Sequence, residues 1–301
     1  MKYILTFIFI IQTFTIFAQE NIKNDFVKVA DNMKFPEGPA WDGKNTVYVS
    51  NCYGTWITRI KPDKCDSFVV APTNPIPFEK TNGLAFNKDN YLYACDYGKG
   101  AILKFNKDGN CELVTDGYLG KKFNRPNDLA FDKNGNLYFT DPKSYDKNIP
   151  DGVVYKINKK NKKVSVAYSG LCFPNGIAFS KDGKKLFVCE SAKERVLQFK
   201  IKKDGTLTKP VEFIHLPGGD PDGIAFDVEG NLYIAHFGGQ AIIVVKPDGS
   251  IKEKITTPGK KPSNVEFAGK DLKTLYITED ETNAVYRKEV GVAGLKLFSL
   301  P

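Results

Sequence analysis

The chain has few side chains that could serve as a general base at neutral pH, because only two of its 301 residues are histidine. These two residues are His215 and His236. A hydrolytic triad needs a histidine beside its serine or cysteine nucleophile. The scarcity of histidine therefore argues against serine or cysteine hydrolase chemistry, and His215, in the apolar segment 213–217, is interpreted as a packed loop residue.

Several other features are missing. The six cysteines match the spacing of no zinc motif, and no linker or low-complexity stretch divides the chain. The net charge is +8, but the lysines are scattered through polar turns and form no basic stripe with interleaved aromatic residues. Nucleic acid is therefore not a predicted partner.

The N-terminus carries the one long apolar run, which begins after Lys2 and ends at Ala18, before the polar residue Gln19. A basic start, a short apolar segment and a small residue at its end are typical of a secretory signal. The run is short for spanning a bilayer. We predict a signal peptide over 1–18 and one domain over 19–301, exported to the periplasm or secreted, with no membrane span after cleavage.

One short phrase recurs six times in the rest of the chain. It begins with Asn or an acid, usually continues with Gly or Asp, and ends in an aromatic residue. A period in the forties that carries strand-like segments is typical of a β-propeller. The copies are EGPAW at Glu37, NGLAF at Asn82, NDLAF at Asn127, NGIAF at Asn175, DGIAF at Asp222 and NVEF at Asn264.

Each phrase is followed by a polar turn and further apolar strands, as in the turn 132–136 and the strand 137–141. Asn, Asp and Gly in these turns suit tight hairpins. The sequence thus predicts an all-β, six-bladed propeller with four antiparallel strands per blade. Residues 25–30 are expected to supply the outer strand of the last blade and to close the circle, which protects the strand edges.

The cysteines leave two interpretations open. Cys52 with Cys65, or Cys95 with Cys111, could each form a disulfide within one blade of an exported protein. Buried free thiols that act as small hydrophobic side chains fit the same pattern.

The first residues of the six phrases should face one another across the central channel, and all six carry side-chain oxygens. Glu37 and Asp222 supply negative charge, while Asn127 and Asn175 add neutral carbonyl oxygens. This set suits one divalent cation with hard oxygen ligands, calcium first, with magnesium, manganese and zinc as alternatives. The competing interpretation is that these residues only cap turns at the strand starts.

Counting across each hairpin turn predicts a second polar ring at the same channel mouth. It pairs Asp141 with Asn127 and His236 with Asp222, and these two side chains become candidates for binding substrate or accepting a proton. The other expected pairs are Glu37 with Asn51, Asn82 with Asp96, Asn175 with Glu190, and Asn264 with Glu279.

Four of these segments together resemble the senescence-marker-protein/gluconolactonase/luciferin-regenerating-enzyme family, in particular its bacterial gluconolactonase branch. They are 35–41, 125–129, 173–176 and 220–223, and the resemblance spans essentially all of 19–301. It implies a six-bladed lactonase with a bound divalent metal held by Glu37, Asn175 and Asp222. It also implies that Asn127 lies between metal and substrate and that Arg125 binds substrate.

Two departures from the family bear on specificity. Tyr145 stands near an acidic residue that contacts sugar in the animal members, and Asp96 stands where many bacterial relatives have histidine. We therefore expect the fine specificity to differ. Arg125 could instead form a salt bridge with Asp128.

The expected reaction is hydrolysis of a small-molecule lactone. The metal would polarise the carbonyl group, Asp222 would assist the attack of water, and Asp141 or His236 is the alternative proton acceptor. Two other functions remain open: metal-dependent hydrolysis of another ester or a phosphotriester, and a non-enzymatic propeller that binds a glycan or a protein. The sequence leaves the oligomeric state open.

Overall fold

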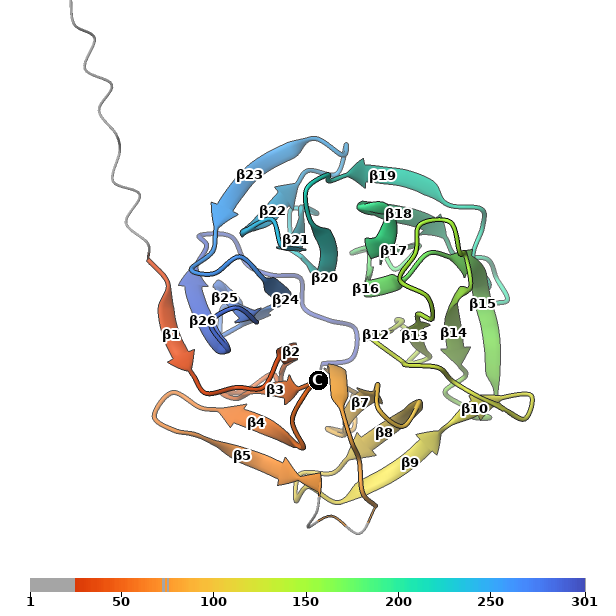
Figure 1. The fold of residues 1–301 in the computed structure, drawn as a ribbon, viewed down its shortest axis with the longest axis horizontal. Helices are drawn as coiled ribbons and strands as arrows, with labels where there is room; N and C mark the ends of the chain where they lie inside the picture. Colours follow the sequence, from red (N-terminus) through yellow and green to blue (C-terminus); the bar gives the residue numbers. More distant parts are fainter. Residues whose placement is uncertain (1–24, 72–73, 75, 301) are drawn as a thin grey trace, which may run out of the picture.

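Six four-stranded antiparallel sheets surround a central axis (Figure 1). The structure is a computed structural model that describes residues 25–71, 74 and 76–300. The predicted fold class, an all-β six-bladed propeller, is confirmed. The predicted signal peptide over 1–18 lies outside the described residues. No helix within the described part of the chain is long and apolar enough to cross a lipid bilayer.

Blades 1 to 3 follow one another along the chain, each with its first strand nearest the axis. Blade 1 comprises β2 (Pro36–Trp41), β3 (Val47–Asn51), β4 (Trp56–Ile60) and β5 (Cys65–Val70). Blade 2 comprises β6 (Thr81–Phe86), β7 (Leu92–Asp96), β8 (Ala101–Phe105) and β9 (Cys111–Thr115). A short hairpin of β10 (Gly117–Tyr118) and β11 (Lys121–Lys122) precedes blade 3, which comprises β12 (Leu129–Phe131), β13 (Leu137–Asp141), β14 (Gly152–Ile157) and β15 (Val164–Leu171).

Blades 4 and 5 repeat this order, and blade 6 completes the circle. Blade 4 comprises β16 (Pro174–Phe179), β17 (Lys185–Glu190), the 3-10 turn η2 (Ser191–Lys193), β18 (Arg195–Lys200) and β19 (Val211–His215). Blade 5 comprises β20 (Asp220–Phe226), β21 (Leu232–Phe237), β22 (Ala241–Val245) and β23 (Ile251–Thr256). Blade 6 comprises β24 (Pro262–Ala268), β25 (Thr274–Glu279), β26 (Ala284–Glu289) and β1 (Val27–Ala30).

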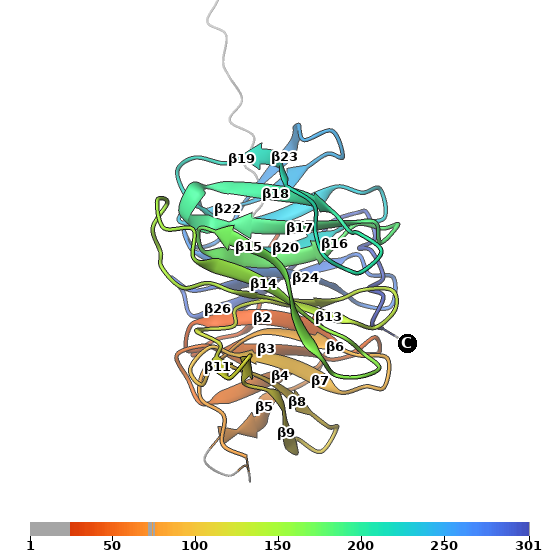
Figure 2. The same cartoon turned by 90° about the vertical axis from the view of Figure 1, so that its right-hand side faces the viewer.

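The N-terminal strand closes the ring, as the sequence predicted. Val27 of β1 pairs with Arg287 of β26 in antiparallel register, so β1 is the outer strand of blade 6. The first and last parts of the folded chain therefore share one sheet, which removes an exposed edge. Viewed from the side, the strands run across the thickness of the disc (Figure 2).

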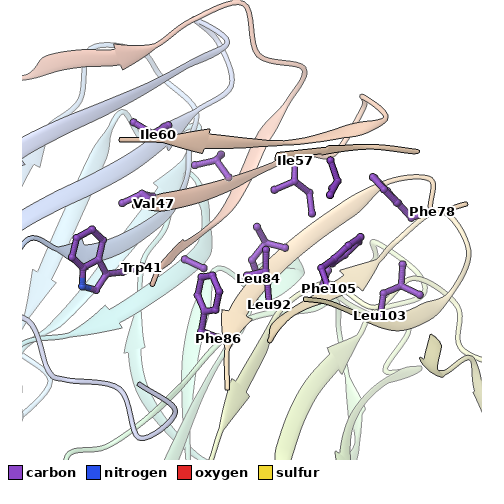
Figure 3. Packing of buried hydrophobic residues seen from close by; sticks show 14 of the residues in the cluster. Trp41, Val47, Ile57, Ile60, Phe78, Leu84, Phe86, Leu92, Leu103 and Phe105 are labelled. Atoms are coloured by element: carbon purple, nitrogen blue, oxygen red, sulfur yellow. The ribbon is translucent and has the colours of Figure 1, made fainter. Parts of the chain in front are cut away.

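The hydrophobic core is divided among the contacts between neighbouring blades. Between blades 1 and 2, Trp41, Val47 and Ile57 face Leu84 and Phe105 (Figure 3). Equivalent clusters lie between blades 2 and 3, 3 and 4, 4 and 5, and 5 and 6. Apolar side chains thus alternate between the two faces of each sheet and pack against both neighbours.

This packing decides between the two interpretations of the cysteines, because all six are free. Cys95 packs between blades 2 and 3, whereas Cys111 packs between blades 1 and 2, on the other face of the same sheet. Cys52 is buried near the axis, and Cys65 is exposed at the start of the outer strand β5. Neither proposed disulfide forms, since the partners of each pair point to different places.

Glycine is required where the inner strands converge on the axis. A Cβ atom on Gly176 would lie 2.1 Å from the carbonyl oxygen of Asp222, and one on Gly83 would lie 2.4 Å from a carboxylate oxygen of Asp128. Contacts this short are essentially never seen for real Cβ atoms, so the second residue of the phrase must be small in these blades. The inner strands can therefore approach one another closely, and the channel is narrow.

Candidate active site

The first residues of the six phrases, here called the ring residues, lie where the inner strands are irregular. In blade 1 the pairing of β2 with β3 shifts between Glu37 and Ala40, and equivalent shifts occur in blades 2, 4, 5 and 6. A β-bulge bends a strand and re-aims its side chains. The ring residues are thus directed at the channel mouth by backbone geometry that recurs around the propeller.

Five ring residues line one cavity of about 160 Å³ at the mouth, which has room for an ion and several water molecules. Its floor is polar and its wall is largely aromatic. The cavity is lined by Glu37, Asn82, Asn127, Asn175 and Asp222 from the ring, together with Phe35, Cys52, Tyr53, Tyr97, Tyr145, Phe173, Ser191, Asp220 and Phe237.

The floor presents oxygen atoms that lack protein partners. Glu37 is 3% exposed and Asp222 is 7% exposed. Oδ1 of Asp222 is buried without a hydrogen bond, and within residues 25–71, 74 and 76–300 the side chains of Asn127 and Asn175 form none either. Buried polar groups are nearly always satisfied, so this donor set fits a hard cation or an ordered polar ligand.

The electrostatics of the floor also fit a bound cation. Burial raises the pKa of Glu37 to about 8, and the nearby carboxylate of Asp128 adds to the increase. Burial also raises the pKa of Asp222 well above its usual range, with a further contribution from Glu37. Both carboxylates are therefore short of positive charge. No group of three or more His, Cys, Asp or Glu side chains among the described residues is arranged to hold a metal, so a cation here would also depend on the Asn oxygens.

The predicted second ring is wrong, because the bulges shift the register by one residue. Ser50, not Asn51, lies opposite Glu37, and His236 lies opposite Pro221 rather than Asp222. A shift of one residue turns a side chain to the other face of a sheet. The expected partners consequently point away from the channel mouth.

These six residues, here called the cap residues, instead bind the backbone that leads into each inner strand. Asp141 accepts the N–H groups of Asn124 and Arg125 at 3.0 and 2.8 Å. His236 Nε2 lies 3.1 Å from the carbonyl oxygen of Leu216, which can only accept, so Nε2 carries a proton. Neither Asp141 nor His236 is among the residues that line the cavity. The cap residues are Asn51, Asp96, Asp141, Glu190, His236 and Glu279.

In several blades the residue one position after the cap residue lies at the channel mouth, where the predicted second ring was expected. Cys52, Tyr97, Ser191 and Phe237 all line the cavity. In blade 6 the residue at this position is Asp280. Counting residues across the hairpin without the bulge gives Glu279 instead, so the sequence did not predict Asp280 as a site residue. The mouth is therefore more varied in chemistry than a ring of acids and one histidine.

Asp280 is a third buried carboxylate beside the floor. It is 8% exposed, and both of its oxygens are buried without a hydrogen bond within the described part of the chain. Burial raises its pKa to about 10, and the carboxylate of Glu37 contributes to the increase. Asp280 therefore extends the set of buried carboxyl groups that lack a positive partner toward blade 6.

Arg125 borders the aromatic wall of the cavity without being among the residues that line it, and its role in substrate binding stays a prediction. Its guanidinium group donates to the hydroxyl of Tyr97 at 2.9 Å and to the carbonyl oxygen of Lys143 at 2.5 Å. Its Cζ lies 5.6 Å from the centre of the Tyr97 ring and 5.9 Å from that of Phe173. The salt bridge to Asp128 is absent among the described residues, because that carboxylate accepts backbone N–H groups at the narrow part of the channel.

Tyr145 holds an acidic residue, Asp220, at the rim of the cavity. Its hydroxyl lies 2.7 Å from both carboxylate oxygens of Asp220, and its ring packs edge-on against Phe173 at 5.0 Å. Asp220 lines the cavity. An acidic hydrogen-bond acceptor is thus present at this part of the rim, supplied by blade 5 and oriented by Tyr145.

Neither Cys52 nor Ser191, which both line the cavity, is activated as a nucleophile. Burial and the carboxylates of Glu37 and Asp280 raise the pKa of the Cys52 thiol well above its usual range, so this thiol stays protonated and unreactive. Ser191 donates its hydroxyl proton to the carbonyl oxygen of Pro221 at 2.8 Å. The exclusion of triad chemistry that began with the histidine count is consistent with these contacts.

Comparison with known proteins adds relatives to this geometry. The family described as "SMP-30/Gluconolactonase/LRE-like region" matches residues 35–280. A gluconolactonase of Zymomonas mobilis is 30% identical over 278 residues, which cover 83% of this chain and 77% of the relative. A diisopropyl-fluorophosphatase of Loligo vulgaris is 32% identical over 226 residues, which cover 69% and 71%. A solved gluconolactonase structure from Xanthomonas campestris superposes with a TM-score of 0.76 at 27% identity and covers 89% of each chain.

Proposed function

Because the chain belongs to the SMP-30/gluconolactonase/LRE-like family, we propose that it is a hydrolase that opens a sugar lactone at the channel mouth. The observation that carries the proposal is the cavity floor, where oxygens of Glu37, Asn127, Asn175 and Asp222 converge with few protein partners. The similarity of the chain to gluconolactonases over most of its length supports a sugar lactone as the substrate class.

We further propose that these four residues hold one divalent cation, calcium first, with magnesium, manganese or zinc as alternatives. Two carboxylates and two amide oxygens form a hard-oxygen donor set, and the raised pKa values of Glu37 and Asp222 are what carboxylates show when a counter-charge is missing. When bound, such an ion would polarise the lactone carbonyl and stabilise the negative charge that develops on its oxygen.

The reaction adds water to the lactone carbonyl carbon and breaks the ring C–O bond. The proton released by the water ends on the departing ring oxygen, which leaves an open-chain hydroxy acid. Asp222 is the proposed proton acceptor because its Oδ1 is free and lines the cavity. Asp141 is less suited because both of its carboxylate oxygens accept backbone N–H groups. His236 has a buried Nδ1 without a hydrogen-bond partner among the described residues, but it is not among the residues that line the cavity.

Arg125 is proposed to bind substrate oxygens at the rim. Its fork of N–H donors suits paired oxygens, and its position is fixed by the Tyr97 hydroxyl and by the backbone bond from its own N–H to Asp141. Asp141 thus acts as a positioning residue for Arg125. Asn127 would lie between the cation and the substrate.

The test is a panel of aldonolactones assayed with and without EDTA, against the rate of uncatalysed hydrolysis. We expect chelator-sensitive turnover and calorimetric binding of one divalent ion per chain. Asp222→Asn should lower kcat about 10²- to 10⁴-fold, the usual contribution of a positioned general base, while thermal unfolding stays cooperative. The matched control is Asp63→Asn, a change in an exposed turn between β4 and β5. Near-normal turnover by Asp222→Asn would remove this residue from the mechanism.

A second candidate is hydrolysis of a phosphotriester, favoured by the similarity to the Loligo vulgaris diisopropyl-fluorophosphatase. Turnover of organophosphates without turnover of any lactone would support it. If no ester of either kind is cleaved but EDTA lowers the Tm, the cation would be structural and the protein a binding propeller.

A further inference from the structure

Three cationic side chains stand over the aromatic wall of the cavity. The ammonium Nζ of Lys80 lies 5.6 Å from the centre of the Tyr53 ring, and that of Lys261 lies 5.8 Å from the centre of the Phe237 ring. Arg125 lies over Tyr97 at 5.6 Å. All three of these rings line the cavity. The three cations, here called the rim cations, therefore border its wall without being among the lining residues.

None of the three cations has an ion-pair partner within the described residues. Every ion pair in residues 25–71, 74 and 76–300 joins other side chains, such as Arg195 with Glu190 at 2.6 Å. Lys80 and Lys261 are exposed, whereas Arg125 is half-buried. Cations on an aromatic face that form no ion pair are available to an incoming anion.

The backbone holds the three cations in equivalent places. The N–H of Lys80 donates to Asp96 at 3.2 Å, that of Arg125 donates to Asp141 at 2.8 Å, and that of Lys261 donates to Glu279 at 2.8 Å. The acceptors are the cap residues of blades 2, 3 and 6. The rim cations are therefore anchored by buried carboxylates at the segment that enters each inner strand, unlike lysines at hairpin tips.

Tyr97 joins two of the cations into one site. Its backbone N–H donates to the carbonyl oxygen of Lys80 at 2.8 Å, and its hydroxyl accepts from Arg125 at 2.9 Å. Tyr97 thus contacts Arg125 through its side chain and Lys80 through its backbone, while the Lys80 ammonium stands over the neighbouring wall residue Tyr53. Asp220, held by Tyr145, lies on another part of the rim, in blade 5, where Lys261 stands over Phe237, the strand partner of Asp220. The part of the rim with Tyr53 and Tyr97 therefore carries two cations, and the blade 5 part carries an acid and one cation.

We propose that the lactone carries a second, anionic group, a carboxylate or a phosphate, which binds near Lys80 and Arg125 at the part of the cavity wall formed by Tyr53 and Tyr97. This inference rests on the proposed lactonase function. The reacting ring would sit on the polar floor, and its hydroxyl groups would meet Asp220 on the blade 5 part of the rim. Lys261 adds positive potential on the adjoining arc of the rim.

The test compares matched lactones that differ in charge. The phosphate arm uses D-glucono-1,5-lactone and its 6-phosphate, and the carboxylate arm uses D-glucono-1,4-lactone and D-glucaro-1,4-lactone. We expect kcat/KM for at least one anionic lactone to exceed that of its neutral partner about ten-fold at low salt. We expect this preference to shrink as NaCl is added, because salt screens exposed charges.

Variants show whether Lys80 is responsible. Lys80→Gln should lower the anionic-to-neutral ratio about five-fold, since an exposed ionic contact contributes up to about 1 kcal/mol, and Lys80→Arg should restore it. The matched control is Lys44→Gln, in the exposed hairpin at the far end of blade 1, which should leave the ratio unchanged. If Lys80→Gln slows both lactones equally, the lysine only supports the acidic floor and the proposal is overturned.

The remaining outcomes separate this inference from the proposed function. Equal turnover of neutral and anionic lactones, with the same salt dependence, would overturn the anionic substrate while the lactonase function stands. If no lactone is cleaved, the lactonase function fails, and titration calorimetry with 6-phosphogluconate and gluconate still decides about the anion site. Binding of 6-phosphogluconate no tighter than gluconate would then overturn it.

Discussion

Glu37→Gln should change how the stability of the ion-free protein depends on pH. Glu37 is 3% exposed, and burial with the Asp128 carboxylate raises its pKa from 4.5 to about 8. The folded state therefore binds a proton more tightly than the unfolded state does. The resulting stabilisation is fully present below pH 4.5 and is lost as the pH rises through 8.

The size of the effect follows from one proton. Between these two pH values, a difference of one bound proton changes the free energy of unfolding by about 1.4 kcal/mol per pH unit. From pH 5.5 to pH 7.5 the protonated Glu37 thus loses about 2–3 kcal/mol of stabilisation, or roughly 5 °C of Tm at about 2 °C per kcal/mol for a domain of this size. Gln carries no charge at any pH, so Glu37→Gln should lack this part of the decline.

The assay is thermal unfolding in EDTA at pH 5.5, 6.5 and 7.5 for the wild type, Glu37→Gln and the control Glu253→Gln. Glu253 is exposed on β23, so its variant should follow the wild type. The Tm advantage of Glu37→Gln should grow with pH, and saturating calcium should remove the decline of the wild type by supplying the missing positive charge. Parallel Tm curves for the wild type and Glu37→Gln in EDTA would refute the reasoning.

Three further predictions concern the rim, the channel and the N-terminus. Arg125→Ala should raise KM at least ten-fold with a smaller change in kcat; steady-state kinetics showing an unchanged KM would give Arg125 a structural role only. Gly176→Ala places a Cβ atom 2.1 Å from the Asp222 carbonyl oxygen, so urea unfolding should show a loss of about 2–3 kcal/mol. Gly120→Ala, whose Cβ meets no described atom within 4 Å but whose φ is +77°, should lose only the cost of the left-handed backbone, about 1 kcal/mol. If the protein is exported, N-terminal sequencing of the mature form should begin at Gln19, and a chain that retains Met1 would contradict the signal peptide.

The repeat allowed the number of blades, the closing strand and the ring residues to be predicted, because each is fixed by spacing along the chain. The register at the mouth could not be predicted in the same way. In blade 2, Leu84 pairs with Ala94, and an unbroken ladder would bring Asn82 opposite Asp96. A bulge intervenes, and Thr81 takes that place.

A Gly within a strand often marks a bulge, and Gly follows the ring residue in blades 1, 2, 4 and 5, so the bulge has a signal in the sequence that the spacing of the repeat does not use. Its consequence is large because strand side chains alternate with a period of two. One extra residue moved His236 out of the predicted second ring and brought Asp280 to the mouth. Asp141 instead binds the backbone N–H groups of Asn124 and Arg125. The direction in which a side chain points also decides its tertiary contacts, such as the alternative salt bridge between Arg125 and Asp128. Spacing along the chain does not give that direction.

Six copies of one unit within a chain separate the residues that build the fold from those that give function. The cap residue has the same task in every blade, and it is a hydrogen-bonding side chain each time, from Asn51 to Glu279. The residue two positions before the ring residue has no such common task. It is Phe35, Lys80, Arg125, Phe173 and Asp220 in blades 1 to 5, and Phe35 and Phe173 adopt positive φ angles of 56° and 57°, which non-glycine residues rarely adopt.

Where equivalent positions differ so much in chemistry, and two of them adopt an unfavourable backbone conformation, the fold alone does not explain them. They surround the cavity whose floor lacks positive charge. Specificity is therefore expected to reside in these positions at the rim, and the reaction itself in the ring residues below.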